Sequence, residues 1–298
     1  MPCSVQSIAD PMPARSNKLP RVLLFGALVV ASLTFVACGE DPADSDGGEA
    51  IEHVHGLGIN PADGALFIAT HSGLFRSAEG SELAERVGTS TQDTMGFTVV
   101  GPDRFLGSGH PGPGEEGPSN LGLIESIDGG GTWSGVSLPG EADFHVLRYA
   151  QNTVYGFNGP TGLIMVSADE GETWTEREPP APVFDLAVDP DDPDRVFITT
   201  ERGLASSDDA GKRWRPVPGD IGLLAWGETD RLYLVNGAGE VQVSADGGRT
   251  WTDRGSIGGQ PGAFVAGPDG DLYAALVDGT VLGSTDGGAS WSVRSTQG

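Results

Sequence analysis

Short apolar runs separated by polar turns recur along the chain after residue 50. The stretch that begins at residue 183 shows one unit clearly: "VFDLAV", the turn "DPDDPDR", then "VFITT", "GLASS" and, after a further turn, "RWRPV". Runs of this length that are rich in β-branched and aromatic residues and bounded by Asp, Pro and Gly are typical of β-strands. Residues 53–77 follow the same plan. The pattern predicts an all-β protein built from small antiparallel units.

A motif of the form S-x-D-x-G-x-x-W marks the end of most units. It occurs at 126–133, 167–174, 207–214, 244–251 and 284–291, and the first serines are 41, 40, 37 and 40 residues apart. A period near forty residues is that of a four-stranded propeller blade. The unit at 53–77 ends in Ser77 without the Asp or the Trp, so we interpret it as a degenerate copy. We therefore expect six blades, at about 51–88, 92–138, 141–178, 182–217, 219–255 and 261–295.

These segments resemble Asp-box repeats, also called BNR repeats, of sialidases, related glycoside hydrolases, sortilin-type receptors and a photosystem assembly factor. The resemblance implies a six-bladed β-propeller of four-stranded antiparallel blades. It also implies that each box forms the hairpin between the third and fourth strands, away from the functional face. An Asp side chain accepts backbone N–H bonds across a tight turn, and a Trp packs against the blade. We expect the box aspartates to serve the scaffold: Asp128, Asp169, Asp209, Asp246 and Asp286.

The first 38 residues are typical of a secretory signal peptide. Three basic residues precede the apolar run "VLLFGALVVASLTFVAC", and the ending "FVACG" resembles a bacterial lipobox, with Phe35 where the pattern prefers Leu. An uncleaved transmembrane anchor is the alternative, since this run is at the short limit for a span. Either way the domain lies outside the cytoplasm of a bacterium. We expect mass spectrometry of the N-terminal peptide to find a lipidated Cys38, whereas a chain that still begins at Met1 would contradict this.

Composition limits the partners. The formal net charge is −25, which argues against nucleic acid or an anionic membrane surface as a main partner. The 47 glycines and 21 prolines are spread along the chain, as expected for many turns. Residues 39–50 are acidic and predict a disordered tether between the leader and a propeller at 51–298. With Cys3 removed and Cys38 lipidated, the mature chain has no pair of thiols for a disulfide.

The five histidines are confined to the first three blades. In the implied propeller, the starts of the first strands and the ends of the second strands meet at one rim around the central funnel. The histidines map to such positions: His53 and His55 start blade 1, His71 closes its second strand, His110 closes the second strand of blade 2, and His145 starts blade 3. Residues two apart on a strand share a face, so His53 and His55 are expected to address one site.

This placement predicts a ligand site, with a transition metal as the first candidate, because imidazole is the commonest metal ligand. The candidate ligands are His53, His55, His71, Met95, His110 and His145. Imidazoles with a thioether favour copper, and imidazoles with a carboxylate suit zinc, so Met95 favours copper. Two alternatives stay open: rim histidines that only bond the backbone, and Met95 as a core residue.

The motif "HVHGLG" followed by box-bearing blades also resembles bacterial proteins grouped with glycosyl hydrolases of the sialidase superfamily. A sialidase would need three arginines, a Tyr with a Glu partner and an Asp acid, and this set is not recognisable; Arg148 alone lies on a plausible inner strand. Another glycosidase would need two carboxylates at a defined separation, and the candidates are Asp143, Asp185 and Glu201.

We therefore rank a binding module first, for a metal ion, a glycan or a surface protein, and a glycoside hydrolase second. The insertion "PGPGEEGPSN" at 111–120 follows His110 and is expected at the same rim. It is open to two interpretations, a lid over a ligand or a surface loop without a role.

Overall fold

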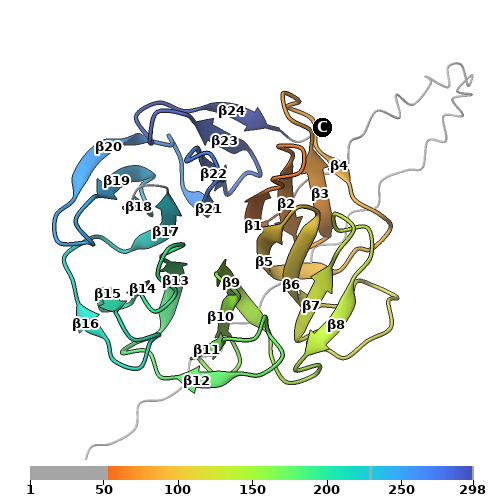
Figure 1. The fold of residues 1–298 in the computed structure, drawn as a ribbon. Helices are drawn as coiled ribbons and strands as arrows, with labels where there is room; N and C mark the ends of the chain where they lie inside the picture. The colour runs from red at the N-terminus through yellow and green to blue at the C-terminus, as the bar shows by residue number, and fades with distance from the viewer. Residues whose placement is uncertain (1–52, 228–229, 297–298) are drawn as a thin grey trace, which may run out of the picture. The chain divides into compact units, whose positions relative to one another are not determined.

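The computed structural model describes residues 53–227 and 230–296, which form a six-bladed β-propeller (Figure 1). Blade 1 holds β1 (Val54–Ile59), β2 (Leu66–Thr70), β3 (Gly73–Ser77) and β4 (Glu85–Arg86). Blade 2 holds β5 (Asp93–Gly101), β6 (Arg104–His110), β7 (Leu123–Ser126) and β8 (Ser134–Ser137). Blade 3 holds β9 (Phe144–Ala150), β10 (Thr153–Asn158), β11 (Leu163–Ser167) and β12 (Thr175–Arg177). Blade 4 holds β13 (Val183–Val188), β14 (Val196–Thr200), β15 (Gly203–Ser207) and β16 (Arg215–Pro216). Blade 5 holds β17 (Gly222–Gly227), β18 (Arg231–Asn236), β19 (Glu240–Ser244) and β20 (Thr252–Ser256). Blade 6 holds β21 (Pro261–Ala266), β22 (Leu272–Leu276), β23 (Val281–Ser284) and β24 (Ser292–Ser295).

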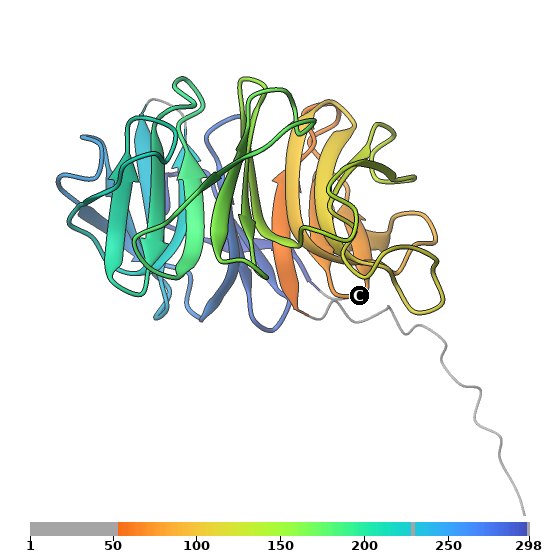
Figure 2. The same cartoon turned by 90° about the horizontal axis from the view of Figure 1, so that it is seen from below.

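In every blade the strands follow one another in the sheet in chain order, and all pairs are antiparallel. The first strand of each blade lies innermost and contacts the first strands of both neighbouring blades, so six strands surround the central axis (Figures 1 and 2). The predicted all-β class and the six blades are confirmed. Over the described ranges, no helix is long and apolar enough to cross a bilayer.

The core consists of six apolar clusters, each between two neighbouring blades. The second strands explain why the sequence shows continuous apolar runs there. In β2, "LFIAT", Leu66 and Ile68 pack toward blade 6, whereas Phe67 and Ala69 pack toward blade 2. Successive side chains of a strand point to opposite faces, and here both faces are buried. Neither face of a second strand is exposed to solvent, so apolar and polar residues do not alternate along its sequence.

The S-x-D-x-G-x-x-W segments form the hairpins between third and fourth strands. In blade 2 the Ser126 hydroxyl donates to Asp128 Oδ1 (2.8 Å), the Gly130 N–H donates to Ser126 Oγ (2.8 Å), and the Thr132 N–H donates to Asp128 Oδ1 (2.9 Å). The same three bonds recur in the other four copies. Each aspartate is thus committed to closing its own turn.

The ring closes through hydrogen bonds from the C-terminal strand of blade 6 and the residue after it to the degenerate copy in blade 1. Arg294 donates to Ser77 Oγ (3.0 Å) and to the Ser81 carbonyl (2.8 Å), and the Thr296 N–H donates to the Glu82 carbonyl (2.9 Å). Ser77 keeps the serine of the motif but binds an arginine from the last blade in place of the missing Asp. The loss of the motif in blade 1 therefore coincides with the closure of the ring.

The aspartates of the S-x-D-x-G-x-x-W motif are expected to determine how far the pH can fall before the folded state loses stability. Hydroxyl donors Thr173, Thr250 and Ser290 lower the pKa of Asp169, Asp246 and Asp286 to about 2, and Arg213 does the same for Asp209. The folded state therefore binds fewer protons than the unfolded chain between about pH 4 and pH 2. The contribution of these aspartates to the free energy of unfolding is fully present above this window and is lost as the pH falls through it. We expect the thermal midpoint to drop from pH 4 to pH 2 and Asp246→Asn to flatten that slope. A midpoint that stays level over this range would contradict the prediction.

Candidate metal centre

The first, innermost strands of most blades contain a β-bulge near their starts. In five blades one extra residue interrupts the pairing with the second strand, and these bulge residues are His55, Met95, His145, Phe184 and Gly262. Leu223 occupies the matching place in blade 5, where the pairing is regular. All six line one cavity of about 240 Å³ at the end of the central channel where the inner strands begin. Because β-bulges redirect side chains, three adjacent blades present His55, Met95 and His145 to this channel mouth.

Three side chains from two blades form what we call the first His/Asp cluster: His55, His71 and Asp93. His71 directly follows β2 and Asp93 opens β5. His71 Nδ1 lies 2.8 Å from Asp93 Oδ2, and His55 Nε2 lies 3.5 Å from Asp93 Oδ1. One ligand atom from each of the three residues can be chosen so that all lie within 4.8 Å of one another. This spacing is compatible with a single metal ion.

The electrostatics of this cluster favour a neutral imidazole beside a carboxylate. The His55 side chain is 18% exposed, and burial, followed by the neighbouring His71, lowers the pKa of His55 to about 4 despite the opposing effect of Asp93. His55 therefore keeps a lone pair at neutral pH. His55 Nε2 and Asp93 Oδ1 are both buried without a hydrogen-bond partner. Buried polar atoms of this kind are costly unless they are satisfied, and a cation between them would satisfy both.

His110, Asp143 and His145 form the second His/Asp cluster. Asp143 Oδ2 lies 2.9 Å from His145 Nε2 and 3.5 Å from His110 Nε2. Burial opposes ionisation of Asp143, but the hydrogen bond from His145 and the charges of both histidines hold the pKa of this carboxyl below its usual range. The same hydrogen bond raises the pKa of His145. Two blades thus contribute to this cluster as well.

The rim of blades 1 to 3 holds all six predicted ligands, and four of them, His55, His71, His110 and His145, belong to the two His/Asp clusters. His53 is exposed at the edge of the first cluster, with its ring centroid 5.2 Å from that of His71. Met95 belongs to neither cluster; it lines the channel-mouth cavity together with His55 and His145. Asp93 was missed by the sequence analysis. The signal was available, since Asp93 precedes Met95 by two residues as Asp143 precedes His145.

The three candidate catalytic carboxylates lie in different surroundings. Asp143 belongs to the second His/Asp cluster. Asp185 is buried and accepts hydrogen bonds from Arg148 (2.8 Å) and from the Leu224 N–H (2.7 Å), and burial raises its pKa. Glu201 lies exposed on the turn after β14. Each carboxylate therefore has its own environment, and these contacts do not join any two of them into the pair that glycoside hydrolysis uses.

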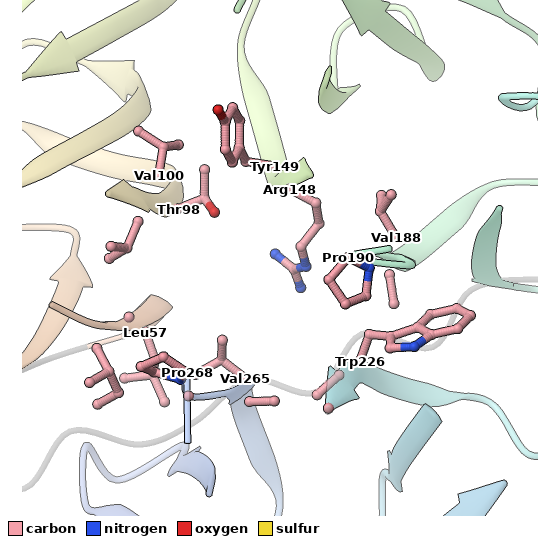
Figure 3. Close-up of a pocket in the computed structure, with 18 of the residues that line it drawn as sticks. Leu57, Thr98, Val100, Arg148, Tyr149, Val188, Pro190, Trp226, Val265 and Pro268 are labelled. Atoms are coloured by element: carbon pink, nitrogen blue, oxygen red, sulfur yellow. The ribbon is translucent and has the colours of Figure 1, made fainter. Parts of the chain in front are cut away.

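The opposite end of the channel is a larger hollow. A cavity of about 740 Å³ is lined by the later residues of the inner strands, among them Val100, Val188, Trp226 and Val265, and Figure 3 shows Arg148 pointing into it. Arg148 also lines the channel-mouth cavity. The pair of Arg148 with Asp185 therefore stands between the two cavities. The lining of the larger cavity combines apolar side chains with polar groups.

The insertion at 111–120 is fastened beside the second cluster. Glu115 accepts hydrogen bonds from the Thr91 N–H (2.7 Å) and the Gly112 N–H (3.0 Å). The Ser119 carbonyl lies 2.6 Å from His110 Nδ1. These bonds tie the loop to the connection between blades 1 and 2 and to one candidate ligand. Whether the loop covers a ligand stays a prediction.

Comparisons with known proteins agree with the fold. No family model and no curated protein matches the chain. A GH74 xyloglucanase from Xanthomonas campestris is similar in structure, with a TM-score of 0.55 and 18% identity over 83% of this chain and 45% of that one. An ancestral GH74 enzyme gives 0.54 and 14% over 84% and 39%, and YCF48 from Cyanidioschyzon merolae gives 0.51 and 15% over 82% and 85%.

The chain thus spans less than half the length of the two GH74 proteins. Likeness at these identities establishes the shared β-propeller fold and nothing about the site. The resemblance to Asp-box repeats rests on the S-x-D-x-G-x-x-W sequence motif.

Proposed function

We propose that this chain is an extracytoplasmic, lipid-anchored β-propeller that binds a transition metal ion at the first His/Asp cluster. The observation that carries the proposal is the convergence of ligand atoms from His55, His71 and Asp93 within 4.8 Å. The signal peptide, Cys38 and the tether lie outside the described residues, so anchorage rests on the sequence alone.

The geometry of the cluster fits a small metal ion. Bonds of 2.0–2.1 Å in a tetrahedral site place neighbouring ligand atoms about 3.3 Å apart. The distances from His71 Nδ1 to Asp93 Oδ2 (2.8 Å) and from His55 Nε2 to Asp93 Oδ1 (3.5 Å) lie on either side of this value, and one ligand atom of each residue lies within 4.8 Å of the others. An ion in the cluster would pair the buried His55 Nε2 and Asp93 Oδ1.

The ligand types fit zinc and copper. Two imidazoles and a carboxylate suit zinc, and nitrogen and oxygen ligands also suit copper(II). Met95 lines the same cavity as His55, and its thioether favours copper. A glycosidase is the weaker alternative, because Asp143 and Asp185 bond to different partners, Glu201 is exposed, and the GH74 neighbours support the fold alone.

The test is a calorimetric titration of the full, metal-free chain with copper(II) and with zinc in detergent. Both cysteines are replaced (Cys3→Ser and Cys38→Ser) so that no thiol competes for the metal. We expect saturable binding that a chelator reverses. Heats that never saturate would overturn the proposal.

A further inference from the structure

The larger cavity of the central channel lies at the end where the inner strands finish. Its volume of about 740 Å³ is within the range of roughly 300–1,000 Å³ that small-molecule sites occupy. Inner strands of all six blades contribute to its wall, and among the described residues that line it none belongs to either His/Asp cluster. Figure 3 shows Arg148 reaching into the space that these strands surround. The cavity is therefore a separate place in the fold with a charged group of its own.

Three neighbouring blades hold Arg148 in position. Arg148 Nη2 donates to Asp185 Oδ1 on β13 (2.8 Å), and Nη1 donates to the Leu147 carbonyl of its own strand, β9 (2.9 Å). The Leu224 N–H on β17 donates to Asp185 Oδ2 (2.7 Å), so a third blade fixes the carboxylate. A guanidinium group carries five N–H donors, and these two bonds occupy two of them. The Arg148 side chain is 27% exposed, so donors remain for a molecule in the cavity.

We infer that the larger cavity binds an uncharged organic molecule with an apolar body and a carbonyl or hydroxyl oxygen that accepts a hydrogen bond from Arg148. This would be a further function of the propeller, at the opposite end of the channel from the first His/Asp cluster. It goes beyond the proposed metal binding and does not depend on it.

The charges around Arg148 favour an uncharged ligand. Asp185 already balances the guanidinium group, and Asp191, which lines the same cavity, is exposed and acidic. An anionic ligand would add a further negative charge to a wall that has no net positive charge. A cationic ligand would be repelled by the guanidinium group. A neutral oxygen needs no counter-charge, and a hydrogen bond from a charged donor is stronger than one between neutral groups.

The wall also offers a surface for an apolar body. Val100, Trp226 and Val265, from blades 2, 5 and 6, are half-buried and line the cavity. An apolar body packed against them would remove apolar surface from water, which is favourable. Thr98 adds a hydroxyl on the blade 2 side of the wall (Figure 3). Apolar walls with a few fixed polar groups are the usual composition of small-molecule sites.

The test uses three naphthalene probes that carry, at the same ring position, an acetyl, an ethyl or a carboxylate group. Binding to the full, metal-free chain is measured by equilibrium dialysis in detergent, and partition into the detergent is subtracted with a reference that contains no protein. We expect saturable binding of one acetyl probe per chain. The ethyl probe should bind roughly 10- to 100-fold more weakly, because it cannot accept the charge-assisted hydrogen bond. The carboxylate probe should also bind more weakly than the acetyl probe.

Four variants locate the bound probe. Val100→Trp fills the cavity without touching the ion pair and should abolish binding. Val293→Trp is the matched control, because Val293 lies on the outer strand β24 and is 42% exposed, and it should bind as the parent does. Arg148→Lys keeps a cation for Asp185 but loses the guanidinium fork, so it should reduce the advantage of the acetyl probe over the ethyl probe. His71→Ala should bind as the parent does.

Several results would overturn the inference: no saturable binding, equal affinities for the acetyl and ethyl probes, tightest binding of the carboxylate probe, or unchanged binding by Val100→Trp. The metal titration is carried out without these probes, so a failure of this inference and a failure of the proposed function are distinguishable. Circular dichroism confirms that each variant is folded. If Arg148→Lys does not fold, the three probes with Val100→Trp and Val293→Trp still decide the question.

Discussion

His71→Ala is expected to weaken binding of the ion at the first His/Asp cluster by roughly 100-fold. A structural zinc site of four ligands supplies about 10–16 kcal/mol, or about 3 kcal/mol for each ligand, and 1.4 kcal/mol corresponds to a factor of ten. His71 is the partner at 2.8 Å from Asp93, yet its side chain is 46% exposed, so its loss should leave the core unchanged. Asp93→Asn should have an effect of similar size, since it keeps the shape and removes the charge.

The measurement is the calorimetric titration of each variant beside the parent chain. His53→Ala is the control, because His53 lies at the edge of the cluster and is exposed. We expect its affinity to change far less than that of His71→Ala. Equal affinities for the parent, His71→Ala and Asp93→Asn would remove this cluster as the binding site. A melting temperature equal to that of the parent excludes unfolding as the cause of any loss.

Phe105→Ala is expected to lower the free energy of unfolding by about 3–5 kcal/mol, the usual cost of truncating a fully buried aromatic residue. Phe105 is 0% exposed in the cluster between blades 1 and 2. Its ring centroid lies 4.6 Å from that of Phe67 in blade 1 and 5.5 Å from that of Phe97 in its own blade. Alanine would leave a cavity between two sheets whose spacing is set by the rest of the ring, so little collapse can offset it.

Thermal unfolding of the metal-free protein tests this, because a bound ion would itself raise the midpoint. For a chain of this size each kcal/mol shifts the midpoint by roughly 2–4 °C, so a fall of roughly 6–20 °C is expected. Ile127→Ala is the control, since Ile127 is 75% exposed and should change the midpoint little. A fall no larger than that of the control would mean that the interface between blades 1 and 2 is not a major source of stability.

The sequence by itself determined the architecture. A motif repeated about every forty residues, together with apolar runs between turns, predicted six blades, and the structure has six. This was possible because each blade is made from one contiguous segment, and its hairpin bonds, such as those of Asp128 with Ser126 and Thr132, join residues at most four apart. Local patterns are sufficient when the repeating unit is local. The rim position of the histidines followed from the same repeat.

Only the tertiary structure decided which side chains meet. Asp93 pairs with His71 across a blade boundary, and the histidines divide into two clusters because each carboxylate lies between neighbouring blades. The bulges that turn His55, Met95 and His145 toward the channel mouth depend on strand register. Similarly, Asp185 is held by Arg148 from the preceding blade and is not part of a carboxylate pair. Strand register and the contacts between blades are set by packing around the closed ring, and no single segment of forty residues contains that information. The fold could therefore be predicted from the sequence, whereas the partners of each side chain at the site could not.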